Sequence, residues 1–336
     1  MTKPRLLLGI AIYSVLPGAF AEEAKQTEVW SLSQDEQDLI NVTNGDIPGE
    51  RNKDGVWEFH LYTTDGYIEM TNGELVWVFS YTYDKGSFKN VGEVTTKEQV
   101  EQLLEPVKVL GDPIHLFVGE KARITLHNTG MHCANELSGI NHVPHTIHFH
   151  GLDFTQAVDG VPSLPVDPVL EHESFTYELT PQYEGSFMGH CQVDSFNHIM
   201  AGMYFPIIIH QDRSKTAYGY KYDRDYTLFF SELSSTANEQ LQESGVVHAL
   251  QDWKADYFLI NGTTFTDNLY HPCSAINDPC SRIVAFEDET VLLRLMAIGA
   301  DHVFAIHPHG YHMEVIALDG RKLKSTYEKD TICIAS

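Results

Sequence analysis

The chain has 336 residues, which is enough for two domains of ordinary size. A hydrophobic content of 43% with 21% charged residues is typical of a folded globular protein and argues against a disordered one. The formal net charge of -25 at pH 7 excludes nucleic acid as a natural partner, because its phosphates would repel the protein.

Residues 1–21 have the features of a signal peptide. Lys3 and Arg5 precede an apolar run over residues 6–16, and Ala19-Phe20-Ala21 gives a small-x-small cleavage site. The apolar run is too short to span a membrane. The sequence therefore predicts a secreted or periplasmic protein with no membrane span.

After a polar lead-in to about residue 55, alternating apolar residues predict strands at 57–62, 74–81 and within 113–128. The segment TTKEQVEQLL at 95–104 has a capping-type threonine and an apolar stripe, and predicts a helix inserted between strands. Short strands separated by turn signals indicate an antiparallel sandwich that closes with a strand at 204–210.

A second unit begins near Asp212, where the chain becomes polar. Its predicted strands are 226–231, 257–260, 281–286, 290–297 and 312–318, with a helix within 234–251. Both units carry an HxHG segment, which suggests two duplicated domains, 22–211 and 212–336.

The stretch from His145 to Met203 is rich in potential metal ligands: HTIHFHG opens it and GHCQVDSFNHIMAGM closes it. A copper site for electron transfer needs a thiolate, two imidazoles and a weak axial thioether, because this soft trigonal set suits both Cu(I) and Cu(II). Cys191, His198 and Met203 supply three of these four donors within one short loop. An upstream histidine must supply the fourth.

Strand parity selects that histidine, because successive side chains of a strand point to opposite faces. His148 and His150 share one face, whereas His145, three residues before His148, points to the other. His190 and Cys191 are separated in the same way. We therefore predict a type 1 copper site of His145, Cys191, His198 and Met203, and a second metal site that contains His148, His150 and His190.

These segments resemble the multicopper oxidase family. HTIHFHGLDFTQAVDGVPSLP is similar to the family's HxHG motif with its DGVP segment, and GSFMGHCQVDSFNHIMAGMYFPIIIH is similar to the strands and ligand loop that close a cupredoxin domain. YFLINGTTF and HPHGYHMEVIALDG resemble the next domain. The resemblance implies an all-β fold of tandem cupredoxin-like Greek-key β-sandwiches with copper as the cofactor.

The resemblance also implies a function, a secreted oxidoreductase of laccase or ferroxidase type. A type 1 copper would take single electrons from a small-molecule or metal-ion donor, and His190-Cys191 would pass them to type 2 and type 3 coppers that reduce dioxygen. His307 and His309 share a strand face in the second unit, so they would supply another part of that copper cluster. Phenols, Fe(II), Cu(I) and Mn(II) are all open as electron donors.

Two features depart from the family pattern. His190-Cys191-Gln192 replaces the usual His-Cys-His triplet, and the chain stops at Ser336, where a family member would continue to another histidine motif. The ligand order also resembles copper nitrite reductases, which hold a mononuclear type 2 copper between subunits of a homotrimer. A blue-copper electron carrier without turnover is the third alternative.

Two further cysteines, Cys273 and Cys280, bracket a proline-containing loop and could pair as a disulfide in an oxidising compartment. The pairing of Cys133 and Cys333 is open.

Overall fold

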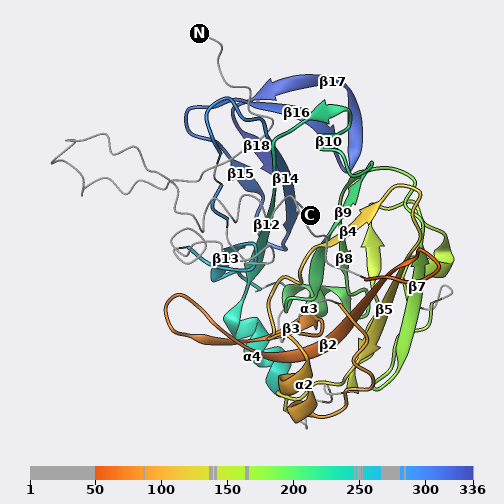
Figure 1. Ribbon diagram of the computed structural model, residues 1–336. Coiled ribbons are helices and arrows are strands. Elements are labelled where there is room, and N and C mark those ends of the chain that lie inside the picture. Colours follow the sequence, from red (N-terminus) through yellow and green to blue (C-terminus); the bar gives the residue numbers. More distant parts are fainter. Residues whose placement is uncertain are drawn as a thin grey trace, which may run out of the picture.

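The computed structural model describes residues 50–85, 88–135, 139, 142–162, 166–245, 247, 251, 253–265, 281–283 and 285–335. The predicted signal peptide, most of the polar lead-in, and both Cys273 and Cys280 lie outside these residues. Within the described part, strands form most of the regular structure, and they gather in two groups that follow each other in the chain (Figure 1).

Two facing sheets make up the first group. In the described residues, one sheet contains β1 (Glu50–Arg51), β2 (Trp57–Glu69), β3 (Leu75–Thr82), β5 (Ala122–Asn128) and β7 (Ser174–Leu179). The other has the order β4 (Ile114–Phe117), β9 (Tyr204–His210), β8 (Gly185–His190) and β6 (His148–His150). The alternating burial of β5 shows why these segments form strands, since every second side chain faces the core between the sheets.

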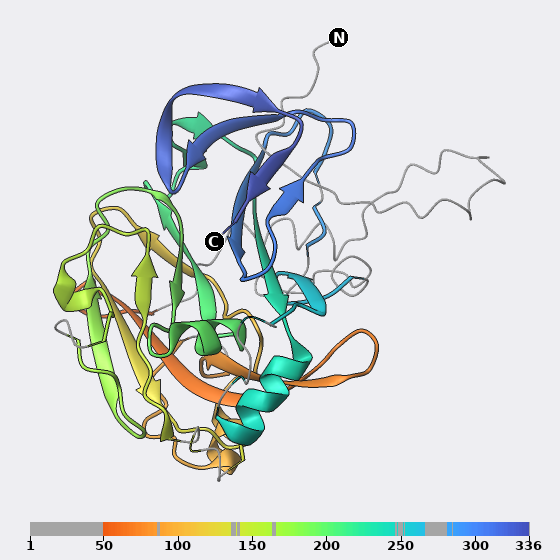
Figure 2. The same cartoon turned by 180° about the vertical axis from the view of Figure 1, so that it is seen from behind.

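The second group is built around β12 (Arg224–Leu233), which lies between β13 (Tyr257–Ile260) and β14 (Val291–Ile298). Three two-stranded pairs surround it: β10 (Thr216–Ala217) with β11 (Tyr220–Lys221), β15 (Phe304–Ile306) with β18 (Ile332–Ile334), and β16 (Met313–Leu318) with β17 (Arg321–Lys329). Figure 2 shows this group, coloured green to blue, above the first group.

Short helices connect the strands: α2 (Lys97–Leu103), the 3-10 turn η3 (Gln156–Val158), α3 (Ser195–Met200) and α4 (Ser235–Ser244). The predicted inserted helix is confirmed as α2, and Thr96 caps it in a reciprocal arrangement with Gln99. Helix α4 packs against β3, and Asn238 Nδ2 donates to the Trp77 carbonyl at 2.8 Å.

A continuous apolar contact joins the two groups. Val78 of β3 and Ile208 of β9 belong to one buried cluster with Phe229 of β12 and Met296 of β14. The rings of Tyr204 and Phe229 stack with centroids 5.4 Å apart. The junction also encloses an ion pair, in which Arg294 of β14 binds Asp225 through two nitrogens and donates to Ser186 Oγ of β8.

The all-β fold class is confirmed, but two of the sequence predictions are wrong. The sandwich is not wholly antiparallel, because β2 pairs with β5, β4 with β9 and β12 with β14 in parallel. Long connections separate the two strands of each pair, as parallel pairing requires. The described residues of 281–286 are not a strand, because Glu289 accepts from Phe286 N at 2.8 Å and closes a turn there.

Candidate metal centre

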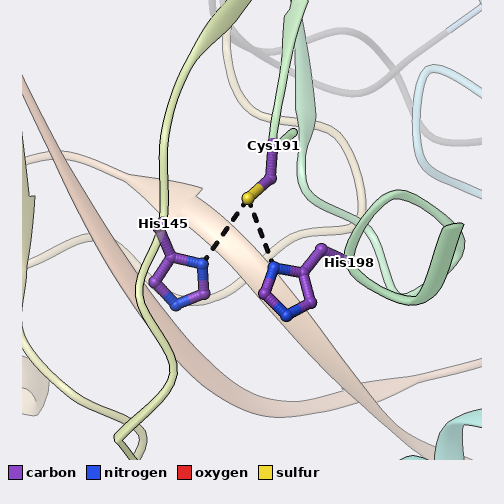
Figure 3. Close-up of side chains that lie close together, drawn as sticks. All are labelled: His145, Cys191 and His198. Carbon is purple, nitrogen blue, oxygen red and sulfur yellow. Dashed lines mark hydrogen bonds between the residues drawn. The ribbon is translucent and has the colours of Figure 1, made fainter. Parts of the chain in front are cut away.

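Three of the predicted ligands meet in the core of the first group. Cys191 Sγ lies 3.2 Å from His198 Nδ1 and 3.7 Å from His145 Nδ1. Figure 3 shows both rings with a nitrogen turned toward the sulfur. All three side chains are buried, and their ligand atoms lie within 4.8 Å of one another.

The local chain path explains this meeting. Strand β8 ends at His190, so Cys191 begins the loop, and α3 then carries His198 back toward the sulfur. Two backbone bonds close the loop: Met203 N donates to His198 O at 3.0 Å, and Cys191 N donates to Met203 O at 3.1 Å. Met203 is fully buried beside them. His145 is fixed from the other side by a reciprocal backbone bridge with Val169.

Burial determines the protonation of these groups. It lowers the pKa of His198 to about 4 and that of His145 well below its usual value, so both imidazoles are neutral at pH 7. It also raises the pKa of Cys191 to about 11. A thiol with this pKa is protonated at pH 7, and it becomes a thiolate when a metal ion displaces its proton.

The donors fit copper by their chemistry. A thiol and two neutral imidazoles that converge on one buried point are the soft ligands that copper takes in electron-transfer sites. His145 Nε2 has no hydrogen-bond partner among the described residues, so the polar contact of this ring is that of Nδ1 with Cys191 Sγ. Phe79 of β3 packs edge-on against both rings, with centroids 5.0 Å from His198 and 5.7 Å from His145.

A second group of histidines lies on the opposite side of the same strands. His148 of β6 is paired in register with His190 of β8, and His150 Nδ1 lies 3.3 Å from His190 Nε2. The ligand atoms of all three lie within 4.8 Å of one another. Burial lowers the pKa of His190 to about 4 and also lowers that of His150, so both rings present neutral nitrogens.

The DGVP segment orients one of these rings. His148 Nδ1 donates to the Asp159 carbonyl at 2.7 Å, and since a carbonyl only accepts, Nδ1 carries the proton and Nε2 is left for a metal. Gly160 makes this contact possible. Its φ is +77°, and a Cβ there would lie 1.8 Å from the Ile147 carbonyl oxygen.

His307 and His309 form neither part of this group nor part of the first one within the described chain. They follow the end of β15 at Ile306 and lie outside any strand, so the prediction that they share a strand face is wrong. Their ring centroids nevertheless lie 5.0 Å apart. His307 Nδ1 donates to the Asp330 carbonyl at 2.8 Å, which leaves Nε2 available as in His148. The His307 side chain is 42% exposed, so this pair faces solvent.

Sequence reasoning missed two contributors. Phe79 lies on a strand predicted only from its alternation, and the role of Asp159 depends on its carbonyl, which no side-chain pattern reveals. Gln192, which stands where the family usually has a ligand, is partly buried, and its backbone N donates to Thr146 Oγ1 at 3.3 Å.

Comparison with known families agrees with this geometry. The family described as multicopper oxidase matches residues 107–214, a segment that includes both histidine groups. Residues 107–214 are therefore similar to a multicopper oxidase domain. Copper is the metal that this domain and its donor set imply.

The chain is also similar to two fungal laccases. Laccase-1 of Cryptococcus neoformans var. grubii is 27% identical over 184 residues, which cover 52% of this chain and 29% of that protein. Laccase-2 of the same fungus is 26% identical over 207 residues, covering 57% and 34%. The match therefore spans about a third of each of these curated relatives.

Solved structures extend the similarity beyond the multicopper oxidase domain. The Blue Copper Oxidase from Nitrosomonas europaea is 25% identical, with a TM-score of 0.58 over 83% of this chain and 72% of that chain. Another multicopper oxidase, 18% identical, superposes with a TM-score of 0.60 and shows the shared fold. Within the described residues, no helix is long and apolar enough to cross a membrane.

Proposed function

We propose that this chain is a secreted or periplasmic copper oxidase in which His145, Cys191, His198 and Met203 hold a type 1 copper. One observation carries the proposal: a buried thiol lies between two neutral imidazoles at 3.2 and 3.7 Å. Copper bound there would take single electrons from a reducing substrate, and copper at the second group would reduce dioxygen.

The second centre is assigned to His148, His150 and His190, with His307 and His309 as further ligands of the type 2 and type 3 coppers. The two HxHG segments support this, because each presents a histidine whose Nδ1 is held by a backbone carbonyl. Since His307 and His309 lie apart from the other three, a second copy of the chain or a further domain must bring the halves together. A homotrimer satisfies this requirement.

The chain's own residues prepare both centres. Phe79 and the surrounding core exclude water from the first, and Asp159 holds the His148 tautomer at the second. The peptide bond between His190 and Cys191 links the two donor sets covalently. We assign residues 22–211 to the domain that contains these groups and residues 212–336 to a second cupredoxin domain, which supplies His307 and His309.

Gln192 favours a second candidate function, copper nitrite reduction. The described group of three histidines is already sufficient for one metal ion, whereas a trinuclear cluster would lack the ligand that the family usually has at position 192. In this reading the second centre is a mononuclear type 2 copper that binds nitrite. A blue-copper carrier that fills only the first centre is the non-catalytic alternative.

Copper stoichiometry with turnover assays separates these functions. Three or four coppers per chain with oxygen uptake would support the oxidase. Two coppers, with decay of the blue colour on addition of nitrite, would support the reductase. A single copper without turnover by either oxidant would contradict both and leave an electron carrier.

A further inference from the structure

The histidines of the first centre are inaccessible to an electron donor. His145 is 0% and His198 is 2% exposed, so a donor in solution cannot contact either ring. Phe79 covers both rings from the side of β3. An electron entering this centre must therefore pass through neighbouring side chains.

The side chains on that face continue to a surface hollow. Trp77 is two residues before Phe79 on β3, and their ring centroids lie 4.8 Å apart. Trp77 also lines a hollow of about 310 Å³ between β3 and α4. The lining residues are Tyr67, Glu74, Leu75, Val76, Trp77, Ser235, Glu239, Gln242 and Glu243. Trp77 is itself only 2% exposed, so its ring lies beneath the hollow, and ring contacts lead from it through Phe79 to His198.

Trp77 is held firmly at the base of the hollow. Its indole Nε1 donates to Asp65 Oδ2 at 2.8 Å, and its carbonyl accepts from Asn238 Nδ2 of α4 at 2.8 Å. Gln242 of α4 also donates to Tyr67 OH at 2.6 Å across the hollow. These bonds hold the α4 wall of the hollow and the indole ring of Trp77 in place.

The charge of the hollow selects among donors. Three carboxylates line it, Glu74, Glu239 and Glu243, and none of its described lining residues is Lys or Arg. Tyr257 OH donates to Glu74 at 2.5 Å, which stabilises that carboxylate as an anion. A cleft lined by one sign of charge concentrates ions of the opposite sign.

We propose that this hollow receives small cationic one-electron donors and that Trp77 and Phe79 form the through-space path from the donor to His198. The inference rests on the proposed type 1 copper. It predicts that the electron donors are cations and not anions. Copper held by His145, Cys191 and His198 would accept one electron from the donor, with no bond made or broken and no proton moved. The indole proton stays on Nε1, bonded to Asp65.

Binding is tested on the copper-free protein. Hexaamminecobalt(III), an inert cation, should quench part of the tryptophan fluorescence, and hexacyanocobaltate(III), its anionic counterpart, should not. Trp77→Phe should remove the quenched part. Trp57→Phe is the matched control. Trp57 lies at the start of β2, where its Nε1 donates to Glu120 Oε2, and it does not line the hollow. Equal quenching in both variants would refute the site.

Electron entry is tested on the copper-loaded protein by anaerobic stopped-flow reduction of the blue band. With hexaammineruthenium(II), the double change Glu239→Gln and Glu243→Gln should lower the rate constant about tenfold at low ionic strength. With hexacyanoferrate(II), it should not lower it. Trp77→Phe should slow the cationic donor without changing the blue spectrum.

Two outcomes distinguish a failure of the proposed function from a failure of the electron-entry path. If no blue band forms in the parent protein, the proposed function fails, and the fluorescence titration still decides whether the hollow binds cations. If the blue band forms but neither the double change nor Trp77→Phe affects reduction by the cation, the entry path is wrong and the type 1 site stands.

Discussion

Replacement of Gly160 by alanine tests how the second centre is built. An added Cβ would lie 1.8 Å from the Ile147 carbonyl oxygen and 2.9 Å from His148 N. Both contacts are with backbone atoms of the segment that leads into β6, so no side-chain rotation relieves them. The segment with Asp159 must move away, and the bond from His148 Nδ1 to the Asp159 carbonyl is lost.

A matched control exists in the same chain. Gly119 has the same φ of +77° but no atom within 4 Å of an added Cβ. Gly119→Ala should therefore cost only the left-handed strain, about 1 kcal/mol of unfolding free energy. Gly160→Ala adds the backbone clash, and we expect a loss on the order of 3 kcal/mol. Metal affinity at the histidine group should fall about 10- to 100-fold, because the partner that fixes the tautomer is removed.

Urea unfolding of the metal-free variants and copper titration monitored by paramagnetic resonance measure the two effects. The type 2 signal should weaken selectively in Gly160→Ala, while the blue type 1 band remains. If Gly160→Ala and Gly119→Ala behave alike in both assays, the contact between the DGVP segment and His148 does not support the second centre.

Three further predictions concern the junction and its neighbours. Arg294→Met should lower the free energy of unfolding in urea by about 3 kcal/mol because it leaves the partly buried Asp225 without its partner, and restoration of stability by Asp225→Asn would verify the cause. Burial lowers the pKa of His115 to about 3 and of His210 to about 4. The neutral rings therefore contribute fully to the free energy of unfolding above pH 6.5, and this contribution is lost as the pH falls toward these values. His210→Phe should flatten the dependence of stability on pH in this window. Ser234→Ala should lower the thermal midpoint through a loss of about 1 kcal/mol, because the hydroxyl caps α4, whereas an unchanged midpoint would deny that role.

Strand parity explains how the sequence predicts the two histidine groups. His148 and His150 share a face of β6, and the separation of His190 from Cys191 follows from the end of β8, so one-dimensional alternation suffices to sort them. The helix at α2 was predictable for a similar reason, because Thr96 and Gln99 form a local capping box.

Features that depend on distant contacts were not predictable. The parallel pairing of β12 with β14 joins segments separated by more than fifty residues, and alternation alone does not reveal the direction of a partner. The 281–286 segment has apolar residues typical of a strand, but Glu289 closes a turn there instead. Trp77 and Phe79 share a face of β3 by alternation, whereas the hollow beside Trp77 depends on α4 packing against β3.

The visible and paramagnetic resonance spectra of the copper-loaded protein, recorded for the parent chain and for Cys191→Ser, test the central claim most directly. We predict an intense blue band in the parent that Cys191→Ser abolishes, while copper bound to the His148, His150 and His190 group keeps its own signal. A parent protein that binds copper without a blue band, or a blue band that survives in Cys191→Ser, would contradict the assignment of the type 1 site.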